Sequence, residues 1–171
     1  MSDSSAPVDP ASRLAASRAA FAALRPRVEA GEPWPLAGDF GTGPEAAWGP
    51  REILAQTAEM LPFWLGEYER VVEAGRKPGD GLPFGRVAGD ALRIGVLERD
   101  RTLPMRELFD RIDAGIARWE RRLTHAAEGE GGTVGVHPRL GEMTADQVRD
   151  TFVLVHLEEH AAQLEASLGP R

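Results

Sequence analysis

The stretch TADQVRDTFVLVHLEEHAAQLEASLGP, residues 144–170, decides the fold class. Thr144 and Gln147 have the spacing of a capping box, in which each side chain accepts a hydrogen bond from the other residue's backbone N–H group. Apolar residues then recur with the period of an amphipathic helix. The glycine–proline pair at the end of the stretch is a typical helix stop. The stretch therefore predicts a long helix over residues 144–168.

Three further segments show helical spacing of their apolar residues. Pro26 is expected to bend or break the first of them, and Pro62 is expected to kink the second. No segment shows the alternation of a strand, residues 128–135 read as a loop, and DALRIGVLERD in a long connection predicts a short extra helix. Four amphipathic helices of similar length indicate an all-α fold, a four-helix bundle with long connections that allow a crossover. The three further segments are residues 11–30, 50–74 and one that starts near Thr102 and ends near His125.

Composition excludes several classes of function. The chain has 171 residues and a net charge of −7, so it lacks the basic surface of a protein that binds nucleic acid or an acidic membrane. No apolar run approaches the roughly 18 residues of a membrane span. Residues 1–10 have no signal-peptide pattern and are expected to form a disordered tail, with residues 11–168 as a single domain. A cytoplasmic location is the resulting expectation.

Residue types narrow the chemistry further. The chain contains no cysteine, so a zinc–thiolate site, a disulfide and a cysteine nucleophile are excluded. No serine lies in a G-x-S-x-G turn, which argues against a serine hydrolase. Lys77 is the only lysine and lies in no phosphate-binding loop motif. Metal-dependent chemistry and ligand binding remain.

Two of the four histidines, His156 and His160, lie one helical turn apart. On a helical wheel, Thr151, Glu158, Ala162 and Glu165 mark the solvent face, and both histidines lie opposite. Imidazoles at this spacing can bind one metal ion. Buried histidines that hydrogen-bond to carbonyl or carboxylate groups are also common, and this alternative stays open.

The other two histidines suggest no metal site by themselves. His125 is expected at the end of the third long helix, where an imidazole interacts favourably with the helix dipole. His137 lies in the loop before the last helix, within HPRLGEMT. It could supply a further ligand from outside the last helix, because metal sites in helical bundles draw ligands from several elements.

Three stretches together carry a family resemblance: WGPREILAQTAEM (48–60), HPRLGEMT (137–144) and HLEEHAAQL (156–164). They resemble segments of the DinB/YfiT-like superfamily of metal-dependent hydrolases and thiol-dependent transferases. The resemblance covers about residues 11–168. It implies a four-helix bundle with up-down-down-up order.

The resemblance also implies a metal site, with His156 and His160 as ligands from the last helix. The third ligand, a histidine in the family, falls at position 56, where this chain has Gln56. Glutamine is a neutral oxygen donor and a poor ligand for zinc. Glu59, one turn further on, is an alternative ligand, although its wheel position is nearer to solvent.

Two functions follow as expectations. The first is a metal-dependent enzyme with a degenerate site, a hydrolase or thiol S-transferase that holds zinc or nickel and uses a low-molecular-weight thiol such as bacillithiol or mycothiol. The second is a metal-free binding or structural protein in which Gln56 hydrogen-bonds to a histidine directly. Both expectations include a small-molecule ligand and a homodimer. Neither the catalytic residues nor the substrate can be read from the sequence.

The long connection at residues 31–48 has three aromatic residues, Trp34, Phe40 and Trp48. They could close a lid over an apolar pocket. Anchoring of a long loop to the helices is the more favoured interpretation, because connecting segments need such contacts to stay ordered.

Overall fold

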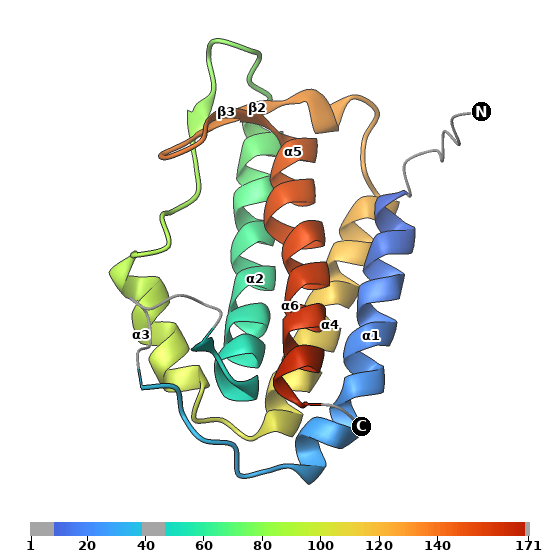
Figure 1. Ribbon diagram of the computed structural model, residues 1–171. Helices are drawn as coiled ribbons and strands as arrows, with labels where there is room; N and C mark the ends of the chain where they lie inside the picture. The colour runs from blue at the N-terminus through green and yellow to red at the C-terminus, as the bar shows by residue number, and fades with distance from the viewer. Residues whose placement is uncertain (1–8, 39–46, 170–171) are drawn as a thin grey trace, which may run out of the picture.

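A computed structural model of the chain describes residues 9–38 and 47–169, which are mostly helical (Figure 1). Residues 1–8, which are most of the tail predicted at residues 1–10, and Phe40 lie outside this range. Asp9, which was assigned to the tail, instead caps the first helix by accepting hydrogen bonds from the N–H groups of Ala11 and Ser12. The α-helices are α1 (Pro10–Ala30), α2 (Pro50–Ala74), α3 (Ala91–Asp100), α4 (Met105–Thr124), α5 (Ala145–Arg149) and α6 (His156–Ser167).

The long helices lie side by side. α1 contacts α4 and α6, and α2 contacts the same two helices from the other side. In Figure 1, α1 and α6 run downward, whereas α2 and α4 run upward. Since α2 and α4 are parallel, the chain between them must return along the outside, and α3 lies in this return segment.

The chain is mostly helical, as predicted, but the all-α class does not cover a small sheet. Three short strands form a sheet in which β1 is parallel to β2 and β2 is antiparallel to β3. β1 has only two residues, and β2 and β3 have four each, the lower limit of the about four to eight residues over which alternation can be read; the burial pattern of β2 does not alternate. The segment 128–135, predicted as loop, also contains a short 3₁₀ helix at Glu130–Gly132. The strands are β1 (Leu82–Pro83), β2 (Val134–His137) and β3 (Gly141–Thr144).

The core lies between α2 and α4, which approach closely at Gly115. A Cβ atom there would lie 2.9 Å from Leu61 Cβ, so no larger residue fits without displacing α2. The Trp119 indole donates a hydrogen bond of 3.1 Å to the Leu61 carbonyl, which precedes Pro62. Pro26 was expected to bend or break the first helix; α1 runs past it to Ala30, so it does not break the helix. Within the described ranges, no helix combines the length and the apolar character needed to cross a bilayer.

The predicted last helix is present but is not a uniform α-helix. Its capping box is confirmed: the Thr144 hydroxyl accepts from the Gln147 N–H, and the Gln147 side chain accepts from the Thr144 N–H. Between α5 and α6 lies a π-helical segment, Asp150–Val155. A π turn holds one residue more than an α turn, so the helix face shifts there. Phe152, Val153 and Leu154, within this segment, are all buried.

Candidate functional site

A cavity of about 350 Å³ lies beside α2, next to the π segment and the β2–β3 hairpin. We call it the α2–π cavity. It contains Gln56 and His156, two of the three residues that the family resemblance assigned to the site. The residues that line it are Gln56, Trp64, Arg86, Val87, Ala88, Arg93, His137, Arg139, Leu140, Thr151, Phe152 and His156.

His156 follows the π segment directly and is half-buried at the cavity wall. Its Nδ1 atom lies 2.8 Å from the carbonyl oxygen of Thr151. A carbonyl only accepts, so Nδ1 carries the proton and Nε2 is the acceptor of the neutral ring. The π segment therefore fixes the orientation of the imidazole through a carbonyl five residues earlier.

His160 is almost fully buried, 2% exposed, and does not line the α2–π cavity. Its Nδ1 atom lies 3.1 Å from the side-chain oxygen of Gln163. The rings of His156 and His160 are 5.9 Å apart between centroids and tilted by 58°. The two histidines thus face the interior to different depths, the first at the cavity and the second in the core.

Gln56 is buried at the cavity wall, as expected from its place at the edge of the apolar stripe of α2. Its side-chain oxygen accepts a hydrogen bond of 2.6 Å from the Arg93 guanidinium, which also donates 2.8 Å to the Ala88 carbonyl. A guanidinium has donors only, so the atom that faces it must be the amide oxygen. The amide nitrogen of Gln56 remains as a donor toward the cavity.

The donor set does not fit a three-ligand metal site. The only atom of Gln56 that could bind a metal already accepts from a cation. A metal ion at that oxygen would lie a few Å from the guanidinium. Two unit charges about 4 Å apart repel by about 4 kcal/mol at an effective dielectric of 20, and a dication doubles this. Among the described residues, no three His, Cys, Asp or Glu side chains form a group that could hold a metal ion.

Glu59 does not supply the missing ligand. Its wheel position suggested a solvent-facing side chain, but only 8% of the side chain is exposed, and its carboxylate pairs with Arg86. Arg86 also lies over the Phe63 ring, 3.7 Å from its centroid. The Glu59 carboxylate therefore neutralises Arg86, one of the three arginines that line the cavity.

His137 has a structural role that the sequence left open. Its Nδ1 atom accepts from the backbone N–H groups of Arg139 and Leu140 at 3.3 and 3.2 Å, and its Nε2–H group donates to the Arg86 carbonyl at 3.1 Å. Both ring nitrogens are engaged, so neither is available to a metal. Gly85 passes so close that a Cβ there would lie 2.6 Å from the His137 ring, and its φ is +77°. The HPRLGEMT turn is thus built around this imidazole.

An aromatic wall, which the sequence did not predict, forms one side of the cavity. The rings of Trp64 and Phe152 stack with centroids 3.9 Å apart and an angle of 6° between planes. At the mouth, Val87 and Leu140 are each nearly half exposed. Such a surface favours a ligand with a flat apolar part. The helical wheel placed Phe152 on the inward side beside the histidines, but nothing in the sequence indicated that it would stack on Trp64 of α2.

The lining of the α2–π cavity is electropositive. Its described residues include three arginines, Arg86, Arg93 and Arg139, and no carboxylate. Arg139 is exposed at the mouth and makes no ion pair with any described residue. A cavity of this charge in a chain of net charge −7 favours anionic ligands over cationic ones.

The aromatic residues of the long connection serve as anchors where they are described. The Trp34 indole donates a hydrogen bond of 2.8 Å to the Val28 carbonyl at the end of α1. Trp48 is buried in the core. His125 caps α4 as expected, with Nδ1 2.7 Å from the Arg121 carbonyl. None of these three residues lines the α2–π cavity.

Comparison of the chain with models of protein families, with curated proteins and with solved structures finds no match in any of the three.

Proposed function

We propose that the chain has the DinB/YfiT-like fold, a four-helix bundle of α1, α2, α4 and the helix formed by α5, the π segment and α6. The directions of these helices support the up-down-down-up order (Figure 1). The turn around His137 and the two inward histidines of the last helix are the features that resemble the family. The three-stranded sheet lies at the end of the bundle where α2 stops and α5 begins (Figure 1).

We infer that the function is metal-independent binding of a small organic anion with a flat apolar part. The hydrogen bond from Arg93 to Gln56 carries this inference. The hydrogen bond places the Arg93 guanidinium where the family resemblance implies a metal ion. It also occupies the amide oxygen of Gln56, so the amide nitrogen is the group that can donate to a bound molecule. The inferred ligand places its apolar part on the Trp64–Phe152 wall.

Polar groups around the wall suit a carboxylate. Arg139 at the mouth offers a planar pair of N–H donors that matches a carboxylate. The Gln56 amide adds a neutral donor, and the Nε2 atom of His156 accepts from a hydroxyl or N–H group. Two kinds of donor and one acceptor around an apolar wall are enough to orient a small ligand.

A metal-dependent hydrolase or thiol S-transferase is the second candidate. One observation favours it: both His156 and His160 have Nδ1 hydrogen-bonded, which is the arrangement that presents Nε2 of a histidine to a metal. The cation at Gln56 argues against it, for the electrostatic reason above. Zinc or nickel and a low-molecular-weight thiol belong to this candidate alone.

Two measurements separate the candidates. Elemental analysis of tag-free protein after passage over a weak chelator should find no retained zinc or nickel. Calorimetric titration should show binding of indole-3-acetate but much weaker binding of the neutral amide, indole-3-acetamide. Stoichiometric metal in the chelator-treated protein would contradict metal-independent binding.

A matched pair of variants locates the ligand. Arg139→Gln should weaken binding of the acid by about tenfold, the loss expected for a partly exposed charge-assisted hydrogen bond. Arg106→Gln removes an exposed arginine of α4 outside the cavity and should leave the affinity unchanged. Equal affinities of the two variants would rule out the cavity as the binding site.

The predicted homodimer and the predicted cytoplasmic location stay predictions. Sedimentation equilibrium gives the mass directly, because a monomer has 18.5 kDa and a dimer twice that.

A further inference from the structure

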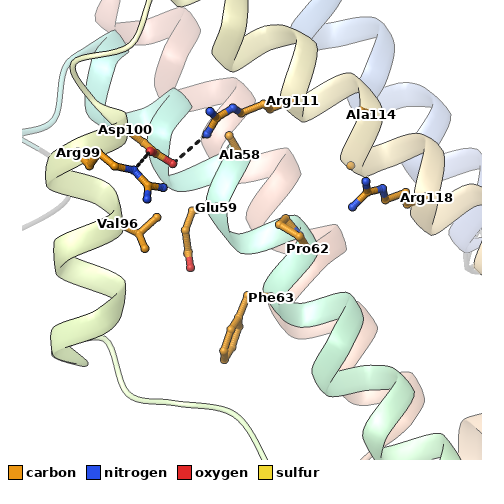
Figure 2. A pocket seen from close by; sticks show the side chains of 11 residues that line it. Ala58, Glu59, Pro62, Phe63, Val96, Arg99, Asp100, Arg111, Ala114 and Arg118 are labelled. Carbon is orange, nitrogen blue, oxygen red and sulfur yellow. Dashed lines mark hydrogen bonds and ion pairs between the residues drawn. The ribbon is translucent and has the colours of Figure 1, made fainter.

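A second hollow, a cleft of about 380 Å³, lies where α3 and α4 both pack on α2 (Figure 2). We call it the α3–α4 cleft. Its lining shares no residue with the α2–π cavity. Glu59 lines the cleft, and its partner Arg86 lines the cavity, so this ion pair is part of the partition between them. Ligands in the two places would not compete for space.

The floor of the cleft is made of small and apolar groups. Ala58 and Pro62 contribute it from α2, and Ala114 and Gly115 from α4. Proline has no backbone N–H, so Pro62 cannot donate to the Ala58 carbonyl as the fourth residue after it in an α-helix would. The floor therefore combines an apolar surface with a carbonyl that lacks its helical donor.

One side of the cleft holds a buried carboxylate between two arginines (Figure 2). The side chain of Asp100 is 4% exposed. One oxygen lies 2.7 Å from Nε of Arg99 and the other 3.2 Å from Arg111, which also pairs with Glu107 at 2.6 Å. Both oxygens of Asp100 are thus engaged. The network holds two guanidinium groups at the edge of the cleft before any ligand is bound.

Arg118 differs from these arginines because it has no such partner. It lines the cleft from α4, two helical turns after Arg111 and beyond Ala114 (Figure 2). The neighbours one turn away on its helix are Ala114, Gly115, Arg121 and Arg122, none of them acidic. It makes no ion pair with the part of the chain that the structure describes.

The charge of the cleft is positive. Three arginines against two carboxylates, Glu59 and Asp100, give the lining a net charge of +1. Glu59 is already neutralised by Arg86 from outside the lining, and Asp100 is shared by two arginines. Arg111 in turn pairs with Glu107 outside the lining, so the positive charge that an anion in the cleft meets is mainly that of Arg118.

We propose that the α3–α4 cleft is a second binding site, which takes a small organic carboxylate with an apolar or aromatic body. The Arg118 guanidinium binds the carboxylate in the fork geometry that suits both groups. The body lies on Pro62 and Phe63, with Val96 of α3 opposite. The apolar floor distinguishes this ligand from a bare inorganic anion, which would gain nothing from it.

The test uses the full chain and three probes: 3-phenylpropionate, the neutral 3-phenylpropionamide and inorganic phosphate. Amide chemical shifts measured by two-dimensional NMR locate each probe. With 3-phenylpropionate, the amides of Ala114 and Gly115 should shift in a saturable way. The neutral amide and phosphate should bind at least tenfold more weakly, because each lacks one of the two groups that the cleft recognises.

Variants complete the test. Arg118→Gln should weaken binding about tenfold, and Ala114→Leu, at an exposed position, should fill the cleft and abolish it. Arg121→Gln, on the same helix outside the cleft, should leave it unchanged. Arg139→Gln should also have no effect, which separates this proposal from the function proposed for the α2–π cavity. Absence of shifts at Ala114 and Gly115, or equal affinities of the Arg118 and Arg121 variants, overturns the proposal.

Discussion

The guanidinium of Arg93 donates a hydrogen bond of 2.6 Å to the side-chain oxygen of Gln56, and both side chains are buried. The two residues are 37 positions apart, one on α2 and one on α3. The hydrogen bond occupies the amide oxygen of Gln56. The group that Gln56 offers to a ligand in the α2–π cavity is therefore the amide nitrogen, a donor. The hydrogen bond also means that position 56 cannot be changed in isolation.

Restoring a metal site should therefore require two substitutions. Gln56→His alone leaves the Arg93 guanidinium beside the new imidazole, so we expect it to retain no zinc after chelator treatment. Gln56→His combined with Arg93→Met keeps an apolar stem at position 93 and removes the charge. The double variant should retain zinc through three imidazoles, as measured by elemental analysis. Circular dichroism of both variants checks that they are folded, and zinc retention by the single variant would contradict the electrostatic argument.

His137 should prove important for the stability of the fold. His137→Ala removes the acceptor of two backbone N–H groups in a buried turn and a ring packed against Phe152. We expect the free energy of unfolding to fall by about 2–4 kcal/mol. His137→Asn places an oxygen near the position of Nδ1 and should recover part of the loss. Denaturant unfolding measures both, and equal stabilities of the two variants would show that the hydrogen bonds contribute little.

Glu52 is the most deeply buried carboxylate of the described chain, with no exposed surface. It accepts hydrogen bonds from the N–H groups of Ala37 and Gly49 at 2.9 and 3.3 Å and pairs with Arg101 at 3.3 Å. Glu52→Gln should lower the free energy of unfolding by about 2–3 kcal/mol, because the buried carboxylate gives up its ion pair with Arg101 and its charge-assisted hydrogen bonds with two backbone N–H groups.

The matched control for this substitution is Glu158→Gln, which breaks the exposed pair with Arg13. Exposed pairs contribute about 0–1 kcal/mol, so this variant should be close to wild type. A loss at Glu52 no larger than the loss at Glu158 would mean that Arg101 is stabilised equally well without the carboxylate.

Tyr68 is the only tyrosine, so its titration can be followed by the absorbance of its phenolate without interference from other tyrosines. Burial, followed by the neighbouring Glu130 carboxylate, raises the pKa of Tyr68 from 10.0 to about 12. Because the pKa of Tyr68 is higher in the folded protein than in the unfolded chain, the folded state is stabilised at pH values below about 10. This stabilisation is lost as the pH rises from about 10 toward 12. The expected loss is roughly 2–3 kcal/mol.

A denatured sample provides the reference for this titration, with a midpoint near 10. Glu130→Gln should lower the midpoint of the native protein but keep it above the denatured value, because burial is the larger cause. A native midpoint equal to the denatured one would show that the Tyr68 ring is open to solvent.

Periodicity and capping were enough to predict much of the helical structure. The capping box at Thr144, the helix from Pro50 to Ala74 and the inward position of Gln56 all depend on local sequence, and all are confirmed. The sheet was missed because β1 has only two residues and the four residues each of β2 and β3 are the lower limit over which alternation can be read.

The site was less predictable, since its decisive contacts join distant parts of the chain. Nothing near position 56 indicates that Arg93 will reach it from α3, and nothing near Glu59 indicates Arg86. Nothing in the sequence of the last helix indicates that Phe152 will stack on Trp64 of α2, or that a π segment will interrupt the helix. Such contacts follow from tertiary packing and need the structure.

The π segment at Asp150–Val155 also changes how this helix compares with a regular α-helix. One extra residue in a helical turn is what a single-codon insertion leaves behind when the flanking turns keep their packing. Removal of Val155, which is exposed, would be the corresponding deletion. An alignment of this helix with an uninterrupted α-helix needs a one-residue gap within the π segment. The capping box at Thr144 lies before that gap, and His156 and His160 lie after it.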